Sequence, residues 1–195
     1  MICGFDEAGR GPLAGPVCAA AVILPPDFPP GLLDDSKKLS PKKREAARLA
    51  ILERALAWGV GWASAAEIDR INIMRSSLAA MARAWEDLVL RSPRFLAPSA
   101  LRAVVDGLYA PELPIPAEAL VKADASVPAV MAASILAKTQ RDRVMELYDA
   151  VYPEYGYGAH KGYPTSAHRE AVLRCGPSPI QRLSFAVKGP AGGLS

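Results

Sequence analysis

The N-terminal segment constrains the fold of this chain more than any other part of it. The sequence ICGFDEAGRGPLAGPV begins with an apolar stretch at residues 2–5, and a second apolar stretch follows at residues 17–24. Both stretches are typical of β-strands, and the glycine-rich segment between them predicts a tight connection. Two carboxylates, Asp6 and Glu7, stand at the entrance of this loop. We therefore expect two neighbouring strands whose connection carries adjacent acids.

Strand and helix patterns alternate along the rest of the chain. The pair Ser40-Pro41 is a helix start signal and predicts a helix that runs to about Trp58. Further strands are predicted at residues 59–65, 101–107 and 118–124, and further helices at residues 72–90, 127–148 and 166–174. This order predicts an α/β fold in which a mixed sheet is flanked by helices.

Length and composition narrow the class of protein. With 195 residues, 51% of them hydrophobic, the chain is long enough for one domain with a buried core. Its three cysteines are widely spaced and form no CxxC pair, which favours a reducing compartment and argues against structural zinc. No signal-peptide pattern is present, and the apolar runs are shorter than the ~20 residues of a membrane span. We expect a cytoplasmic protein with no membrane partner.

Acidic residues stand at or beside the ends of three predicted strands. Each one alone could be a solvated turn residue, but carboxylates that converge repel one another unless a cation neutralises them. A ligand set of oxygen atoms, without His or Cys, suits Mg²⁺ or Mn²⁺. Two such ions can hold both the attacking and the leaving oxygen of a phosphodiester. The candidate ligands are Asp6, Glu7, Asp106 and Asp124.

The glycine loop fits two common phosphate-binding motifs poorly. Residues 9–15 read GxGxxxG, which is one residue off the dinucleotide fingerprint, and they lead into a strand rather than a helix. The chain also lacks the GK[ST] sequence of a P-loop. Acids directly before the loop would oppose a bare pyrophosphate, so nucleotide-binding classes are disfavoured.

Five blocks of the sequence resemble the bacterial ribonuclease HII family. They are GFDEAGRGPLAGPV, DDSKKLS, VVDG, KAD…MAASILAKTQRDRVM and YGYGAHKGYPTSAHREAV, which occur in the family's order over residues 2–185. The resemblance implies a ribonuclease H-like fold with a small helical C-terminal extension. We expect a catalytic core at residues 1–150 and an extension at residues 151–195, together forming one compact unit.

The resemblance also implies an activity and a set of site residues. The activity would be Mg²⁺- or Mn²⁺-dependent cleavage of RNA in RNA–DNA hybrids, with a two-metal site. It would include incision 5′ to a single ribonucleotide in duplex DNA, as in ribonucleotide excision repair, leaving 3′-hydroxyl and 5′-phosphate ends. The family's four acids fall on Asp6, Glu7, Asp106 and Asp124. Its substrate-binding positions fall on Gly9, Arg10 and Gly11, and its junction-sensing tyrosine falls on Tyr163.

Basic residues are candidate contacts for phosphates. The formal net charge is +3, and residues 37–48 hold six Lys or Arg against one acid. We expect Lys37, Lys38 and Lys161 to contact the nucleic-acid backbone, which gives salt-dependent and sequence-independent affinity. The alternative for such a run of charges is a solvated helix face.

Several alternatives fit the same residues. Asp142 competes with Asp124 as the fourth acid, although Arg141 and Asp142 are expected to form local salt bridges. Another nuclease of the same fold, such as a hybrid-only ribonuclease or a resolvase, also fits, as does a non-catalytic nucleic-acid-binding module. The sequence is silent on a sliding-clamp partner, and a monomer is the default expectation.

Overall fold

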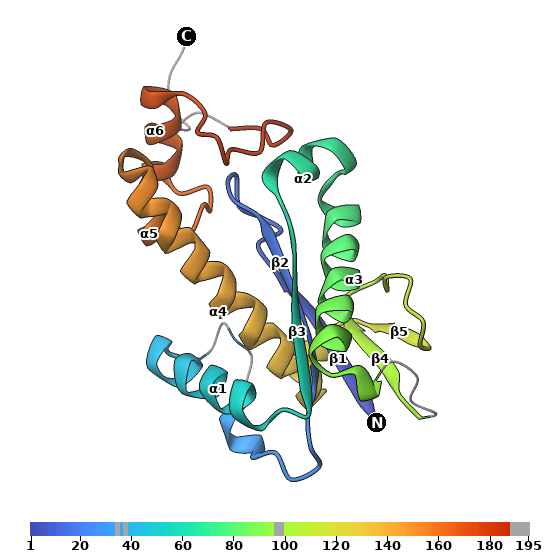
Figure 1. Cartoon of the computed structure of the whole chain (residues 1–195). Helices are drawn as coiled ribbons and strands as arrows, with labels where there is room; N and C mark the ends of the chain where they lie inside the picture. The colour runs from blue at the N-terminus through green and yellow to red at the C-terminus, as the bar shows by residue number, and fades with distance from the viewer. Residues whose placement is uncertain (34–35, 37–38, 96–99, 188–195) are drawn as a thin grey trace.

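The described residues form a mixed five-stranded sheet at the centre of the molecule (Figure 1). The computed structural model describes residues 1–33, 36, 39–95 and 100–187. The strand order is β3-β2-β1-β4-β5. Strand β1 is antiparallel to β2 and parallel to β4, which confirms the expected mixed α/β sheet. The strands are β1 (Ile2–Ala8), β2 (Val17–Ile23), β3 (Ala57–Ala63), β4 (Arg102–Asp106) and β5 (Ala117–Leu120).

Helices cover both faces of this sheet. Helix α3 (Ile73–Arg91) packs on one face, whereas α1 (Pro41–Arg54) and α4 (Pro128–Val151) pack on the other (Figure 1). None of the helices in the described ranges is long and apolar enough to cross a membrane. The shorter elements are α2 (Ala65–Ile71), α5 (Tyr157–His160), α6 (Ser166–Cys175) and the 3₁₀ helices η1 (Pro30–Leu32), η2 (Pro93–Phe95), η3 (Ala123–Ala125) and η4 (Pro153–Tyr155).

Strand β2 lies between two hydrophobic layers. Successive side chains of a strand point to opposite faces of the sheet. The odd-numbered residues of β2 accordingly join the layer that contains Met81 and Leu88 of α3. The even-numbered residues join the layer that contains Ile135 and Leu136 of α4. Because all of β2 is buried, its sequence reads as a continuous apolar run rather than an alternating one.

The helix that starts at Ser40 is shorter than predicted. Its start is as expected, because the Ser40 hydroxyl accepts a hydrogen bond from the Lys43 N–H and Pro41 is the first helical residue. The helix ends at Arg54, however, and the predicted end near Trp58 is wrong because Trp58 belongs to β3.

Glycine residues of β3 allow α3 to approach the sheet closely. A Cβ added to Gly61 would lie 2.0 Å from the Ala80 carbonyl oxygen of α3. The glycines of β3 therefore let a helix pack directly on the sheet.

The strand predicted at residues 118–124 is also shorter. Strand β5 ends at Leu120, and Lys122 then adopts a left-handed conformation with φ 61° that interrupts the extended backbone. Asp124 lies in η3, directly before α4. The prediction that a strand end carries this acid is wrong, because a turn at the start of α4 places it instead.

The C-terminal segment packs against the second half of α4. Met145 of α4 shares a hydrophobic cluster with Tyr155, Tyr157 and Val172, and the same cluster includes Ala14 of the glycine-rich connection. Ala14 also forms a β-bridge with Gln181. The segment after α4 therefore reaches back to the loop that follows β1.

Candidate active site

A pocket of about 470 Å³ lies at the carboxyl-terminal ends of β1 and β4. The four predicted acids, the three residues of the glycine-arginine-glycine element and the predicted tyrosine all line it. Sequence positions as far apart as 6 and 163 thus meet in one place. The lining residues in the described part of the chain are Asp6, Glu7, Ala8, Gly9, Arg10, Gly11, Ser36, Asp106, Asp124, Ser134, Lys138 and Tyr163.

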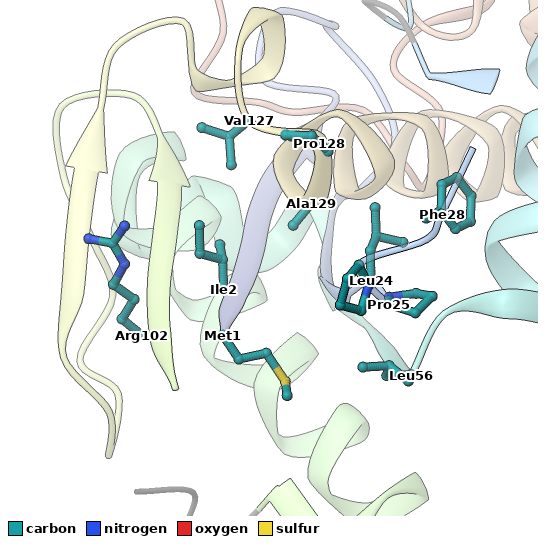
Figure 2. A pocket seen from close by; sticks show the side chains of 11 residues that line it. Met1, Ile2, Leu24, Pro25, Phe28, Leu56, Arg102, Val127, Pro128 and Ala129 are labelled. Atoms are coloured by element: carbon teal, nitrogen blue, oxygen red, sulfur yellow. The ribbon is translucent and has the colours of Figure 1, made fainter. Parts of the chain in front are cut away.

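A larger cavity of about 730 Å³ lies at the opposite end of β1. Figure 2 shows Ile2 of β1, Leu24 and Ala129 at the start of α4 along this cavity. Among the residues that the structure describes, its lining contains no Asp, Glu, His or Cys. These lining residues therefore offer no carboxylate, imidazole or thiol for acid–base chemistry or metal ligation, and the smaller pocket is the candidate site.

The parallel pairing of β1 with β4 brings the first acids together. Phe5 of β1 pairs with Val105 of β4, so Asp6 and Asp106 follow at the same level of two neighbouring strands. The Asp106 Oδ1 accepts a hydrogen bond of 2.8 Å from the backbone N–H of Ala123. This bond ties the end of β4 to η3, which carries Asp124.

Asp6 is the most buried acid of the site, with 5% of its surface exposed. Burial raises the pKa of Asp6 well above its usual range, and the charges of Glu7 and Asp106 raise it further, against the opposing effect of a hydrogen bond with Ser134. The Glu7 N–H also donates to Asp6 Oδ1 at 2.7 Å. Ionised Asp6 is thus unfavourable unless positive charge is supplied.

The chemistry of the donor set fits a hard divalent cation. All four acids offer carboxylate oxygens, which are the ligands that Mg²⁺ and Mn²⁺ prefer. Within the described ranges, no three His, Cys, Asp or Glu side chains are already gathered as a metal-binding group. The acids also have partners within the protein: Glu7 Oε1 lies 3.3 Å from Arg10 Nη1, Asp106 accepts the Ala123 N–H and Asp6 accepts the Glu7 N–H. The residues fit the metal by ligand type and by sharing one pocket.

Gly9 and Gly11 differ in whether the protein's own structure requires a glycine at that position. Gly9 has φ +98°, and a Cβ there would lie 2.0 Å from Nε of Arg141, so both backbone and packing require glycine. Gly11 has neither constraint, because its φ is not in the left-handed region and an added Cβ would meet only Tyr163 at 3.8 Å. The missing side chain at Gly11 therefore leaves space on the pocket side of the loop.

Tyr163 lies at the mouth of the pocket with 41% of its surface exposed. Its ring is 6.0 Å from Lys138 Nζ and 5.9 Å from the guanidinium carbon of Arg141. The Tyr163 carbonyl forms a 3.0 Å hydrogen bond with Nδ1 of buried His168. The Tyr163 ring is therefore exposed to solvent, whereas the Tyr163 backbone is fixed by its hydrogen bond with His168.

The structure does not place the predicted phosphate-contacting lysines in the described lining of the pocket. Lys161 does not line the pocket, because its ammonium donates to Glu146 Oε1 at 2.8 Å and to the Gly158 carbonyl at 2.7 Å. Lys138 lines the pocket instead, together with Ser134 of the same helix. Lys37 and Lys38 lie outside the described residues.

The alternative fourth acid, Asp142, does not line the pocket. Its carboxylate pairs with Lys138 Nζ at 2.8 Å. The predicted local salt bridge of Arg141 is wrong, because the Arg141 side chain is buried and donates to the carbonyls of Pro16, Ala14 and Lys161. Sequence reasoning also missed Arg182, which is fully buried beneath the glycine loop. No local pattern predicts the partners of either arginine, since these partners are distant backbone oxygens.

The sequence model of the ribonuclease HII family matches residues 3–188. The chain belongs to the ribonuclease HII family. The ribonuclease HII of Treponema denticola is 53% identical over 199 aligned residues, which cover 96% of this chain and 99% of that protein. The ribonuclease HII of Dechloromonas aromatica is 52% identical over 185 aligned residues, which cover 95% of this chain and 90% of that protein. The expected enzyme class, a ribonuclease H endonuclease, is confirmed.

A solved structure of the same kind supports the ribonuclease H-like fold. The ribonuclease H2 from Pyrococcus horikoshii OT3 superposes with a TM-score of 0.74 at 26% identity, covering 95% of this chain and 94% of that one. The agreement extends over nearly the full length of both chains. The expected ribonuclease H-like fold is therefore confirmed for the sheet and its flanking helices together.

Proposed function

We propose that this ribonuclease HII family member cleaves the RNA strand of RNA–DNA hybrids and incises 5′ to single ribonucleotides embedded in duplex DNA. The products would carry 3′-hydroxyl and 5′-phosphate ends. The observation that carries the proposal is the convergence of four acids, the glycine loop and Tyr163 on one pocket. Family membership supports the same activity.

The acids would hold two divalent cations, Mg²⁺ or Mn²⁺. When bound, such ions supply an activated water and stabilise the charge on the leaving oxygen. The ligands would be Asp6, Glu7, Asp106 and Asp124, and the raised pKa of Asp6 supports this, because a buried carboxylate beside like charges gains most from a cation. Asp124 is assigned in preference to Asp142 because it lines the pocket.

The glycine loop would read the ribose of the substrate. Gly11 leaves room for a close approach, and a backbone N–H can bond either a 2′-hydroxyl or a phosphate oxygen without an intervening side chain. The 2′-hydroxyl is the group that distinguishes RNA from DNA at a single position. Tyr163 would stack on the sugar that follows the ribonucleotide, because its ring is exposed at the pocket mouth.

Separate substitutions of two acids test the proposed metal site. Asp6→Asn and Asp106→Asn are each expected to lower the cleavage rate of a labelled hybrid in Mg²⁺ by at least about 100-fold, as is typical when a charge-stabilising group is lost. Glu112→Gln is the matched control, since Glu112 is an exposed acid that does not line the pocket. A near wild-type rate in either aspartate variant would contradict the proposal.

A further inference from the structure

Two buried arginines support the glycine loop from inside the protein. Arg141 of α4 and Arg182 of the C-terminal segment are 1% and 0% exposed. In the described part of the chain neither forms an ion pair with a carboxylate. Their partners are backbone carbonyls, so their role is to fix the path of the main chain.

Arg182 binds the loop at three points. Its Nη2 donates to the Gly9 carbonyl at 2.6 Å, its Nη1 to the Arg10 carbonyl at 3.0 Å and its Nε to the Gly15 carbonyl at 2.9 Å. Burial lowers the pKa of Arg182 to about 9, so the group is still charged at neutral pH. These are charge-assisted hydrogen bonds in a dry environment, which makes them strong.

The direction of these carbonyls determines the direction of the next N–H groups. A trans peptide is planar, so the C=O of one residue and the N–H of the following residue point in opposite directions. The chain has no cis peptide bond in its described part. With the Gly9 and Arg10 carbonyls turned inward to Arg182, the N–H groups of Arg10 and Gly11 must turn away from the core.

These two N–H groups are available for a ligand. In the described ranges neither the Arg10 nor the Gly11 N–H donates a hydrogen bond to a protein group. Both residues line the pocket and are exposed. Two adjacent outward N–H groups form a concave site for an anion or a hydroxyl.

Arg182 is itself fixed to the rest of the fold. Its own N–H donates to the Leu13 carbonyl at 2.8 Å. The next two residues are held by Asp69 at the end of α2, whose carboxylate accepts the N–H groups of Leu183 and Ser184 at 2.9 Å each. The guanidinium is thus held in position before any substrate binds.

We propose that Arg182 is a positioning residue for ribonucleotide selection, which holds the Gly9 and Arg10 carbonyls inward so that the Arg10 and Gly11 N–H groups face the substrate's ribose and phosphate. This inference rests on the proposed function. Lysine cannot replace the guanidinium here, because an ammonium lacks the planar fork that reaches three carbonyls. The C-terminal segment would then contribute to selection through Arg182 as well as Tyr163.

The test compares binding to two duplexes that differ by one 2′-hydroxyl. All proteins carry Asp106→Asn so that the strand is not cut, and the readout is the ratio of Kd for the all-DNA duplex to Kd for the duplex with one ribonucleotide. A ratio is independent of the folded fraction, so a merely structural defect does not move it. Arg182→Lys is expected to lower the ratio about tenfold, which corresponds to about 1.4 kcal/mol.

Two further variants complete the comparison. Arg174→Ala is the control, because Arg174 also donates to a carbonyl, that of Glu154, but within the C-terminal segment only; its ratio should stay within twofold of the parent. Asp69→Ala keeps Arg182 but releases the residues after it, and it should lower the ratio about threefold. An unchanged ratio in folded Arg182→Lys overturns the inference, and if that variant does not fold, an unchanged ratio in Asp69→Ala does so.

A second measurement separates this inference from the proposed function. In NMR spectra of the substrate-free protein, the Arg10 and Gly11 amide signals should be sharp in the parent and broadened in Arg182→Lys. Sharp signals in both proteins would overturn the role of Arg182. A parent protein with no preference for the ribonucleotide, but with the expected broadening in the variant, would instead refute the proposed substrate.

Discussion

Replacing Asp6 by Asn should stabilise the metal-free protein while abolishing its activity. Asp6 is buried, and its pKa is raised by desolvation first and by the charges of Glu7 and Asp106 in addition. Asn has nearly the same size, and its Oδ1 can still accept the Glu7 N–H that now donates to the carboxylate at 2.7 Å. The substitution therefore removes an unfavourable charge and leaves the packing nearly intact.

The sign and size of the effect follow from linkage. A folded-state pKa above the unfolded value means that stability is fully present below the unfolded pKa, near 3.8, and is lost as pH rises through the folded pKa. Each pKa unit between the folded and the unfolded state corresponds to about 1.4 kcal/mol of folding free energy. Replacing the charged acceptor by a neutral one costs about 1 kcal/mol. We expect a net gain of about 1–2 kcal/mol at pH 7, or a Tm increase of about 3–6 °C for a chain of this length.

Thermal unfolding in EDTA between pH 4 and pH 8 measures this effect. The Tm advantage of Asp6→Asn should be largest at neutral pH and should shrink toward pH 4, where wild-type Asp6 is protonated. Asp69→Asn is the control, for which we expect a change in stability of the opposite sign. Burial alone would raise the pKa of Asp69, but hydrogen bonds from Ser184 and Leu183 lower it below its usual value. This variant should therefore lose stability at neutral pH. A lower Tm for Asp6→Asn than for wild type at pH 7 would refute the reasoning.

Three further predictions follow from the geometry. Tyr163→Ala should reduce the initial rate of incision at a single ribonucleotide about 10- to 100-fold, since ring stacking contributes about 1–3 kcal/mol. Tyr163→Phe keeps the ring, so its initial rate should stay within about threefold of the wild-type rate. Lys138→Ala should reduce the salt slope of duplex binding by about 1, and Lys161→Ala should change it less, because Lys138 lines the pocket and Lys161 does not. Gly61→Ala should lower the free energy of unfolding by about 3 kcal/mol or more in denaturant titrations, whereas Gly31→Ala, with open space around it, should stay within about 0.5 kcal/mol.

The convergence of Asp6 with Asp106 could be predicted from the sequence. Each aspartate ends an apolar stretch, and the ends of neighbouring parallel strands meet at one edge of a sheet. The structure shows this arrangement, with Phe5 paired to Val105 directly before the two acids. Local patterns place each acid at a strand end, whereas the parallel pairing of β1 with β4 that brings the two acids together comes from the fold.

The placement of Asp124 could not be predicted in the same way. The sequence at residues 118–124 reads as one strand, but the left-handed backbone at Lys122 ends the extended conformation early. That conformation is unusual for a lysine, and composition gives no sign of it. The Asp106 side chain, which accepts the Ala123 N–H, is a tertiary partner that fixes the turn.

The buried arginines illustrate the limit of sequence reasoning most clearly. Charged side chains on a helix commonly pair with opposite charges three or four positions away, so a local ion pair is the ordinary expectation for Arg141. Its guanidinium instead donates to Pro16, 125 positions away, and that of Arg182 donates to Gly9, 173 positions away. Backbone carbonyls have no residue-specific signature, so contacts of this kind emerge only from the fold.

The most direct test of the proposed function is the mapped cleavage of a duplex DNA that contains one ribonucleotide. We expect one cut, at the phosphodiester 5′ to the ribonucleotide, with 3′-hydroxyl and 5′-phosphate products, in the presence of Mg²⁺ or Mn²⁺ and not in EDTA. The Asp106→Asn variant should give no product. Cleavage of a long RNA–DNA hybrid without incision of this duplex, or incision that persists in EDTA, would contradict it.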